Sequence, residues 1–453
     1  MTRLRLPAVL VVGVLMGAPV AGGHVAAAVE PPSIDGPVPA GGPLGSDSVR
    51  TGDACRTTAA VLDPGAPPAS ATAADLRPAW VHGRGEGQVV AIIDTGVNPG
   101  PRLPPVRGAG DVLEGGDGTD DCDAHGTLVA GVLAAREDET GHVGVAPGVE
   151  LVSIRQSSGV LRPTGQEDDG VTVGVGVGTI STLAAAIRAA VDAGAGVINI
   201  SEVACVPAGT RLADDTLGGA IRYAAVEHDV VLVAAAGNVG QTCGAQNPGT
   251  PDPAAPGSDG WEDVVTVASP AWYGDHVLTV GGVDADGAAA DFSLRGPWVD
   301  VAAPAVGLRS VGADGDGVAD LVVSADGART PISGTSFAAP FVAGVAALVR
   351  QARPGLSARQ VISRITGTTL PAAGGHDHAV GHGVVDPVAA VTGVRRSGRP
   401  DPASSVIAAP GPEPIAAGAG AGGVVAATAL TVGAVVLVVV GLSRPPRPGA
   451  RRH

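Results

Sequence analysis

Residues 182–200 read TLAAAIRAAVDAGAGVINI, a helical pattern followed closely by a short apolar run. Leu183, Ile187 and Val191 recur four residues apart, which predicts an amphipathic helix over residues 182–192. Gly194 stands where such a helix would end, and residues 196–200 have the composition of a strand buried on both faces. A helix joined by a short turn to a buried strand is typical of proteins with parallel sheets.

The same alternation continues on both sides of this stretch. Short apolar runs occupy residues 88–93, 150–154, 230–235 and 264–268, and residues 217–228 show a second helical pattern. Strands separated by helices require crossover connections, which place helices on both faces of the sheet. We therefore expect an α/β fold of three layers, with a largely parallel sheet between helices. Ligand sites in such sheets lie beyond the carboxyl ends of the strands.

The composition limits the possible functions. The chain has 453 residues, and 45% of them are hydrophobic, which is enough for a large core and argues against overall disorder. Its 44 acidic and 28 basic residues give a net charge of −16, and all the basic residues are Arg. An acidic chain without Lys repels phosphate backbones, so we expect no nucleic-acid partner.

The first 28 residues have the pattern of a secretory signal. Arg3 and Arg5 precede a short apolar stretch, and small residues follow at 26–28. The alternative is an N-terminal membrane anchor, which the Pro and Gly residues within the stretch disfavour. In an exported protein the four cysteines, Cys55, Cys122, Cys205 and Cys243, are expected to form disulfides.

The other end of the chain predicts a membrane anchor. Residues 416–442 contain no charged side chain and are long enough to span a bilayer as a helix. Residues 443–453 are rich in Arg, which by the positive-inside rule places the C-terminus in the cytoplasm and the rest of the chain outside. Residues 393–415 have the Pro- and Gly-rich composition of a linker.

Three polar residues stand where strands end or helices begin. Asp94 follows the 88–93 run, and His125 and Ser336 each open a helical pattern. Alone, each has an ordinary structural interpretation: a turn residue, a structural histidine and a helix cap. Together, an Asp, a His and a Ser at the mouth of one α/β domain supply the orienter, base and nucleophile of acyl transfer. Asn238, after the 230–235 run, adds an amide donor for an oxyanion.

Four segments carry a resemblance to the subtilisin-like serine proteases. They are IIDTGV (92–97), HGTLVAG (125–131), AAAGN (234–238) and SGTSFAAPFVAGVAAL (333–348), in the Asp, His, Ser order of that family. The resemblance covers residues 80–392 and implies a subtilisin-like peptidase domain. Independently of the resemblance, the helical pattern that begins at Ser336 predicts Pro340 in the first turn, where no backbone donor is needed.

The resemblance also implies roles for individual residues. Asp94 would orient His125, His125 would take the proton of Ser336, and Asn238 would contribute to the oxyanion hole. Substrate-binding residues would be Ser201, Glu202 and Val203 on one side of the cleft and Ala235, Ala236 and Gly237 beside the pocket for the P1 residue, whose carbonyl is attacked. The substrate would be a polypeptide, with no cofactor and no metal.

Residues 29–79 form an extension shorter than the usual inhibitory prodomain of that family, with few large apolar side chains. We expect it to lie on the peptidase domain rather than fold alone. Cys55 and Cys122 are the favoured partners, with Cys205 and Cys243 the second pair, although four cysteines allow three pairings. Signal, extension, linker and anchor together resemble the mycosins, membrane-anchored proteases of type VII secretion systems.

Two other functions remain open from the sequence. The chain could be mainly a structural component of a membrane secretion complex, with proteolysis secondary. An esterase would share the nucleophile, but residues 334–338 read GTSFA and lack the G-x-S-x-G elbow of many such hydrolases.

Overall fold

The computed structural model describes residues 29–42, 48–50, 54–61, 73–163, 171–174, 176–249, 259–371 and 375–394. The chain divides into two units, Met1–Arg395 and Arg396–His453. The predicted signal (1–28), the anchor (416–442), the tail (443–453) and nearly all of the linker (393–415) lie outside the described residues. Among the described residues, no helix is both long and apolar enough to cross a membrane.

A sheet of nine strands forms the centre of the domain, in the order β15-β16-β12-β11-β9-β7-β3-β5-β4. All neighbouring strands are parallel except β15 and β16. The strands are β3 (Val89–Asp94), β4 (Val106–Asp111), β5 (Glu150–Arg155), β7 (Val197–Ile200), β9 (Val231–Ala235), β11 (Val277–Val283), β12 (Val301–Pro304), β15 (Leu370–Pro371) and β16 (Gly383–Val384).

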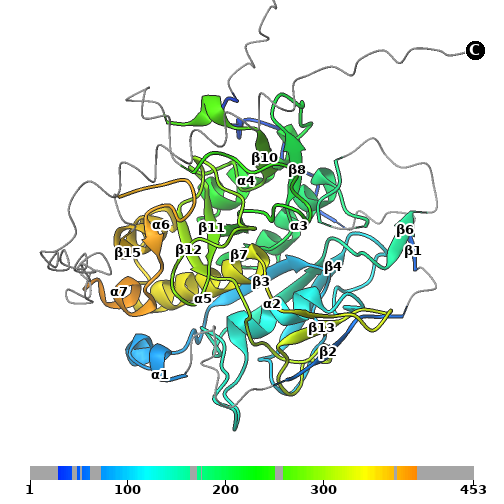
Figure 1. Ribbon diagram of the computed structural model, residues 1–453, viewed down its shortest axis with the longest axis vertical. Helices are drawn as coiled ribbons and strands as arrows, with labels where there is room; N and C mark the ends of the chain where they lie inside the picture. Colours follow the sequence, from blue (N-terminus) through cyan, green and yellow to red (C-terminus); the bar gives the residue numbers. More distant parts are fainter. Residues whose placement is uncertain are drawn as a thin grey trace, which may run out of the picture. The chain divides into compact units, whose positions relative to one another are not determined.

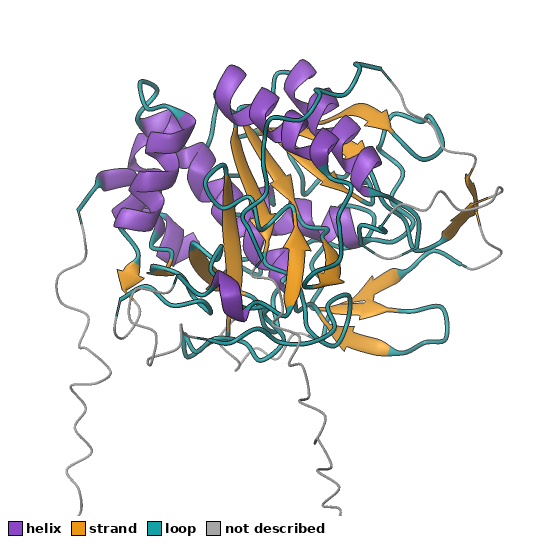
Figure 2. Ribbon diagram, turned by 90° about the horizontal axis from the view of Figure 1, so that it is seen from above, coloured by secondary structure: helices purple, strands orange, loops and turns teal. Residues whose placement is uncertain are grey.

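Helices cover both faces of this sheet (Figures 1 and 2). In β3, Val90 and Ile92 pack into one core with α2 (His125–Ala134) and α5 (Thr335–Ala352), while Ala91 and Ile93 pack into the other. The second core contains α3 (Ile180–Asp192) and α4 (Asp215–Arg222). Alternate side chains of a strand point to opposite faces, so the unbroken burial of residues 90–94 in β3 indicates a sheet between two layers. The predicted three-layer α/β fold is confirmed.

The remaining helices are short. They are α1 (Ala73–Leu76), α6 (Ala358–Gly367), α7 (Pro387–Thr392), 3-10 turns at Ala79–His82 and Trp261–Asp263, and a π-helical turn at Tyr223–Glu227. The helix predicted over 217–228 therefore consists of α4 and this π turn.

One predicted strand exists but does not belong to the central sheet. Residues 264–268 overlap β10 (Thr266–Ser269), but β10 pairs antiparallel with β8 (Ala204–Pro207) and lies outside the nine-stranded sheet. Burial alone produced the error, because a covered two-stranded ribbon is as apolar as a central parallel strand. The sequence did not predict four other strands that have parallel neighbours: β4, β11, β12 and β16.

The described parts of the extension lie on the α/β domain. β2 (Thr57–Ala59) pairs with β13 (Leu321–Val323), which also pairs with β14 (Arg329–Pro331). β1 (Ser48–Arg50) pairs with β6 (Leu161–Pro163). Nearer the N-terminus, the Arg222 guanidinium donates hydrogen bonds to the carbonyls of Ile34 and Gly36.

Both favoured cysteine pairs are disulfides. Cys55 of the extension is bonded to Cys122, three residues before α2, and the Arg56 amide donates to the Cys122 carbonyl at 2.9 Å. Cys205, in β8, is bonded to Cys243. The first disulfide keeps the extension covalently attached beside the start of α2.

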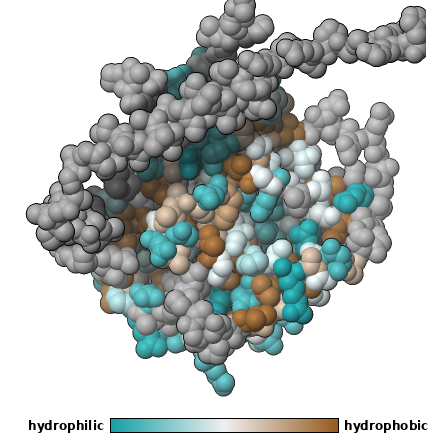
Figure 3. Space-filling view, viewed as in Figure 1, coloured by the Kyte–Doolittle hydropathy of each residue, from teal (hydrophilic) through white to brown (hydrophobic). Residues whose placement is uncertain are grey.

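The surface shown in Figure 3 mixes hydrophobic and hydrophilic residues. Five large apolar side chains are exposed among the described residues, and they come from separate parts of the chain: Val61, Val81, Val226, Val265 and Val394. Scattered apolar side chains of this kind are normal for a folded protein.

Candidate active site

Asp94, His125 and Ser336 meet at the carboxyl end of the sheet. Asp94 is the last residue of β3, His125 the first of α2 and Ser336 the second of α5. His125 Nδ1 lies 2.7 Å from Asp94 Oδ1, and His125 Nε2 lies 3.0 Å from Ser336 Oγ. With Nδ1–H donated to Asp94, Nε2 is left as the acceptor for the serine hydroxyl.

A buried carboxylate fixes His125 in this position. Asp121 accepts hydrogen bonds from the amide and hydroxyl of Thr127, at 2.8 and 2.6 Å, and from the Thr95 hydroxyl at 2.8 Å. Asp121 therefore accepts a hydrogen bond from one of the backbone amides at the start of α2 that have no helical partner. The N-cap residue, Ala124, has no side chain that could do this. Because Thr95 directly follows Asp94, the Asp121 carboxylate connects the end of β3, which carries Asp94, to the start of α2, which carries His125.

The nucleophile is fixed through its own carbonyl. Pro340 lies in the second turn of α5, not in the first as predicted, so the Ser336 carbonyl four residues earlier has no helical N–H partner. The Ser201 hydroxyl donates to this carbonyl at 2.7 Å and itself accepts from the Asn199 amide at 2.8 Å. Ser201 thus supports the nucleophile by its side chain.

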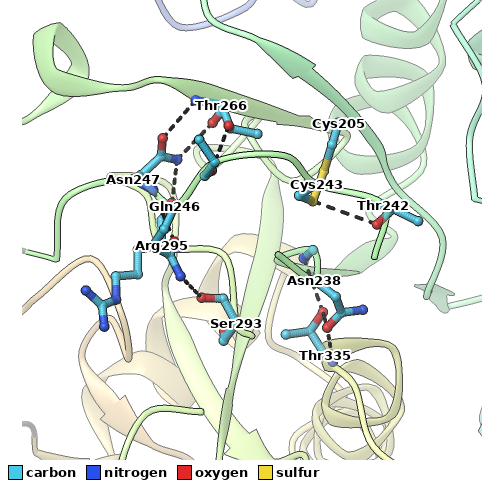
Figure 4. The surroundings of a disulfide bond; sticks show 12 residues. Cys205, Asn238, Thr242, Cys243, Gln246, Asn247, Thr266, Ser293, Arg295 and Thr335 are labelled. Carbon is cyan, nitrogen blue, oxygen red and sulfur yellow. Dashed lines mark hydrogen bonds between the residues drawn. A yellow bond between two sulfur atoms is a disulfide. The ribbon is translucent and has the colours of Figure 1, made fainter. Parts of the chain in front are cut away.

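Asn238 presents a side-chain amide next to Thr335, the residue that precedes Ser336 (Figure 4). Its Oδ1 accepts from the Thr335 amide and hydroxyl at 3.0 and 3.2 Å, which leaves Nδ2 free to donate elsewhere. A Cβ built on Gly334 would lie 3.1 Å from Ser336 Oγ and 3.6 Å from Asn238 Nδ2. The missing side chain of Gly334 therefore leaves space between nucleophile and donor, where an oxyanion can form.

The loop that carries Asn238 is held from behind by the second disulfide (Figure 4). The Cys243 amide donates to the Asn238 carbonyl at 3.1 Å, and the Gly237 amide donates to the Thr335 hydroxyl at 3.1 Å. Ala235 and Ala236 are fully buried, and the Ala236 amide donates to the Val280 carbonyl. The role of these three residues, 235–237, beside the P1 pocket stays a prediction.

Glu202 brings a second carboxylate to His125. Its Oε1 lies 3.6 Å from His125 Nδ1, and the Val203 carbonyl accepts a hydrogen bond from the Gly174 amide at 3.2 Å. One ligand atom each from Asp94, His125 and Glu202 lie within 4.8 Å of one another. The sequence singled out Glu202 only as part of the substrate edge, not for its carboxylate.

Burial lowers the pKa of His125, but the negative charges of Asp94, Glu202 and Asp121 outweigh burial and raise that pKa to about 9. Burial raises the pKa of Asp121 to about 7, and it also raises the pKa of Glu202. The carboxylates therefore stabilise the imidazolium that forms when His125 accepts a proton.

The sequence analysis missed three supporting groups: Thr335, Thr95 and the Asp121 carboxylate. Thr335 and Thr95 lie directly beside Ser336 and Asp94 in the quoted motifs, so adjacency was the available signal. The function of Asp121 depends on a contact across the fold with Thr95, which no local pattern records.

Comparison with known proteins agrees with the catalytic geometry of Asp94, His125 and Ser336. A family model described as the subtilase family (Peptidase S8) matches residues 85–383. Mycosin-4 of Mycobacterium tuberculosis (strain ATCC 25618 / H37Rv) is 51% identical over 326 residues, covering 71% of this chain and 69% of the relative. The chain belongs to the subtilase family, among the mycosins. It is a serine protease.

Two of the solved structures that are similar to this one come from ESX systems. The MycP3 protease from the type VII (ESX-3) secretion system has a TM-score of 0.71 and 43% identity, covering 80% of this chain and 99% of that one. A chain of an intact ESX-5 inner membrane complex has a TM-score of 0.73 and 38% identity, covering 91% of this chain and 98% of that one.

We expect Gly334→Ala to lower kcat/KM by about 100-fold or more, because its methyl group would occupy the oxyanion space. The φ of Gly334, 149°, adds backbone strain for any other residue. Peptide hydrolysis and the rate of fluorophosphonate labelling measure the loss. Gly355→Ala is the matched control, since a Cβ there meets no atom within 4 Å. Equal rates for the two variants would contradict this account of Gly334.

The raised pKa of His125 predicts an alkaline activity profile. Only neutral imidazole can accept the serine proton, so kcat/KM should rise by about tenfold per pH unit below the pKa and level off near pH 9. A series of kcat/KM values measured from about pH 6 to about pH 10 tests this. A plateau already reached near pH 7 would show that the carboxylates do not raise the pKa of His125.

Proposed function

We propose that this mycosin is a membrane-anchored endopeptidase that cleaves exported polypeptides outside the cytoplasm at a type VII secretion system. The observation that carries the catalytic part is the hydrogen-bonded chain from Asp94 through His125 to Ser336, with Asn238 beside it.

In the proposed mechanism, Ser336 Oγ attacks the substrate carbonyl while His125 Nε2 takes the hydroxyl proton. Asp94 holds the imidazole by Nδ1–H and stabilises its positive charge. The oxyanion accepts hydrogen bonds from Asn238 Nδ2 and from the backbone amide of Ser336, one of the free donors at the start of α5. His125 then protonates the leaving amine, and water hydrolyses the acyl-enzyme by the same steps in reverse order.

An extended substrate would pair with the backbone at Glu202 and Val203, which follow β7 at the edge of the site. Ser201 is not free for such a contact by its side chain, because its hydroxyl is bonded to Ser336. The base of the P1 pocket would be formed by the residues that precede Asn238 in the chain: Ala235, Ala236 and Gly237.

The membrane location rests on the sequence and on the relatives. Residues 1–28 have the pattern of a signal and residues 416–442 that of a single transmembrane helix, followed by the Arg-rich tail 443–453. The proposed arrangement places the peptidase domain outside and the C-terminus in the cytoplasm. The similarity to a chain of an ESX-5 inner membrane complex supports it.

A second candidate role is structural. The ESX-5 structure contains its mycosin-like chain within an assembled membrane complex, which favours a contribution to the stability of a secretion machine. Such a role needs the folded domain and the anchor, but it does not need the serine nucleophile.

Ser336→Ala should abolish fluorophosphonate labelling and lower peptide hydrolysis by about 10⁴-fold or more, while the domain stays folded. Mass mapping of the labelled wild-type peptide should place the label on Ser336. Hydrolysis by the variant near the wild-type rate would disprove the assigned nucleophile.

The same variant in a deletion strain separates the two roles. Secretion without substrate processing indicates the structural role, and loss of both secretion and processing indicates that proteolysis is required.

The anchor has its own test. Full-length protein should stay in the membrane pellet after carbonate extraction, whereas a chain ending after Arg395 should appear in the soluble exported fraction. Recovery of both proteins in the soluble fraction would contradict a spanning segment at 416–442.

A further inference from the structure

Glu202 is a carboxylate that transfers no proton in the catalytic steps and acts there only through its charge on His125. It follows Ser201 at the end of β7, and the residue as a whole is 8% exposed. Its Oε1 lies 3.6 Å from His125 Nδ1, beyond hydrogen-bond distance, and that nitrogen is already paired with Asp94. Within the described part of the chain, no donor forms a hydrogen bond with the Glu202 carboxylate. A nearly buried charge without a hydrogen-bond partner is costly unless a ligand supplies one.

The position of this carboxylate is set by a glycine. A Cβ built on Gly174 would lie 2.1 Å from Glu202 Oε2, and Gly174 has a φ of +75°, which also favours glycine. The Glu202 side chain therefore fills the space that a side chain at 174 would take. It lies between Gly174 and His125, and both titratable side chains remain partly exposed, His125 by 21% and Glu202 by 11%.

The surroundings of Glu202 favour a cation. The charged groups that act on it are His125 and Arg56, which favour its ionised form, and Asp94 and Asp123, which oppose it. Arg56 belongs to the extension and follows Cys55, so the disulfide to Cys122 keeps its positive charge near the site. Among the described residues, two carboxylates (Asp94 and Asp123) and one permanent cation (Arg56) act on Glu202.

The direction of an extended substrate determines which side chain meets Glu202. Successive side chains of an extended chain point to opposite sides. With the P1 side chain in its pocket, the preceding P2 side chain would point to the opposite side, and a P2 side chain directed at His125 would also meet Glu202, whose Oε1 lies 3.6 Å from His125 Nδ1. A Lys or Arg at P2 would reach the carboxylate beside that imidazole.

We propose that Glu202 is the specificity-determining residue of this mycosin, selecting Lys or Arg at the P2 position of its polypeptide substrate. The ammonium or guanidinium group donates the charge-assisted hydrogen bonds that none of the described residues gives to the carboxylate. This inference rests on the proposed catalytic roles of Asp94, His125 and Ser336.

The test compares two peptide amides that differ only at P2, where one has Lys and the other norleucine. The two side chains have similar lengths, but only Lys carries a charge. Wild-type full-length protein should show a kcat/KM ratio for Lys over norleucine of about tenfold or more. In Glu202→Gln the ratio should fall to near one. Glu150→Gln, which removes the same charge at the opposite end of β5 from the site, should keep the wild-type ratio.

The wild-type protein alone provides a second measurement if Glu202→Gln fails to fold. The Lys preference should weaken from about pH 8 to about pH 6 as Glu202 becomes protonated, whereas protonation of His125 slows both peptides equally and cancels in the ratio. A wild-type ratio near one, or an unchanged ratio in Glu202→Gln, would overturn the inference while fluorophosphonate labelling of Ser336 still supports the protease. Loss of both hydrolysis and labelling in wild type would overturn the proposed function itself, and the inference with it.

Discussion

The burial of helix α5 is the constraint on which the site depends. Every residue from 335 to 349 is buried, so this helix cannot shift without disturbing the core between the sheet and α2. Ser336 is therefore held by packing along the whole helix. Where Pro340 removes one helical hydrogen bond, Ser201 replaces it from the end of β7, and the replacement joins the nucleophile to the sheet.

The parallel sheet supplies the second half of the arrangement. Because β3, β7 and β9 run in the same direction, Asp94, Ser201 and Asn238 all emerge at one edge, opposite the first turns of α2 and α5. Three carboxylates, Asp94, Asp121 and Glu202, surround His125 there. The acidic surroundings thus serve two purposes: they stabilise the protonated base, and they create a preference for positive charge in the cleft.

Much of this could be predicted from the sequence, and the limits are physical. Residues 88–93, 196–200 and 230–235 were identified as strands because strands buried on both faces are continuously apolar, and the order of the motifs indicated the triad. Residues 264–268 share that apolar character but belong to an antiparallel pair, since hydrophobicity reports burial and not strand direction. β4 contains Arg107 and three other polar or glycine positions, so its pairing is set by β5 rather than by its own composition.

The contacts around the triad were harder to predict. Asp121 with Thr95, Ser201 with Ser336 and Glu202 with His125 each join segments far apart in the chain. A local pattern records residue types, whereas these functions arise from distances that only the fold defines.

The pairing of β2 with β13 protects β13 from being an edge strand. Leu321, Val322 and Val323 are covered on one side by Ala59, Thr58 and Thr57 of the extension. Without them, β13 would become an edge strand with unpaired N–H and C=O groups, a template for pairing with another chain. A protein shortened past residue 61 would thus be prone to aggregate through this strand, even with its active site intact.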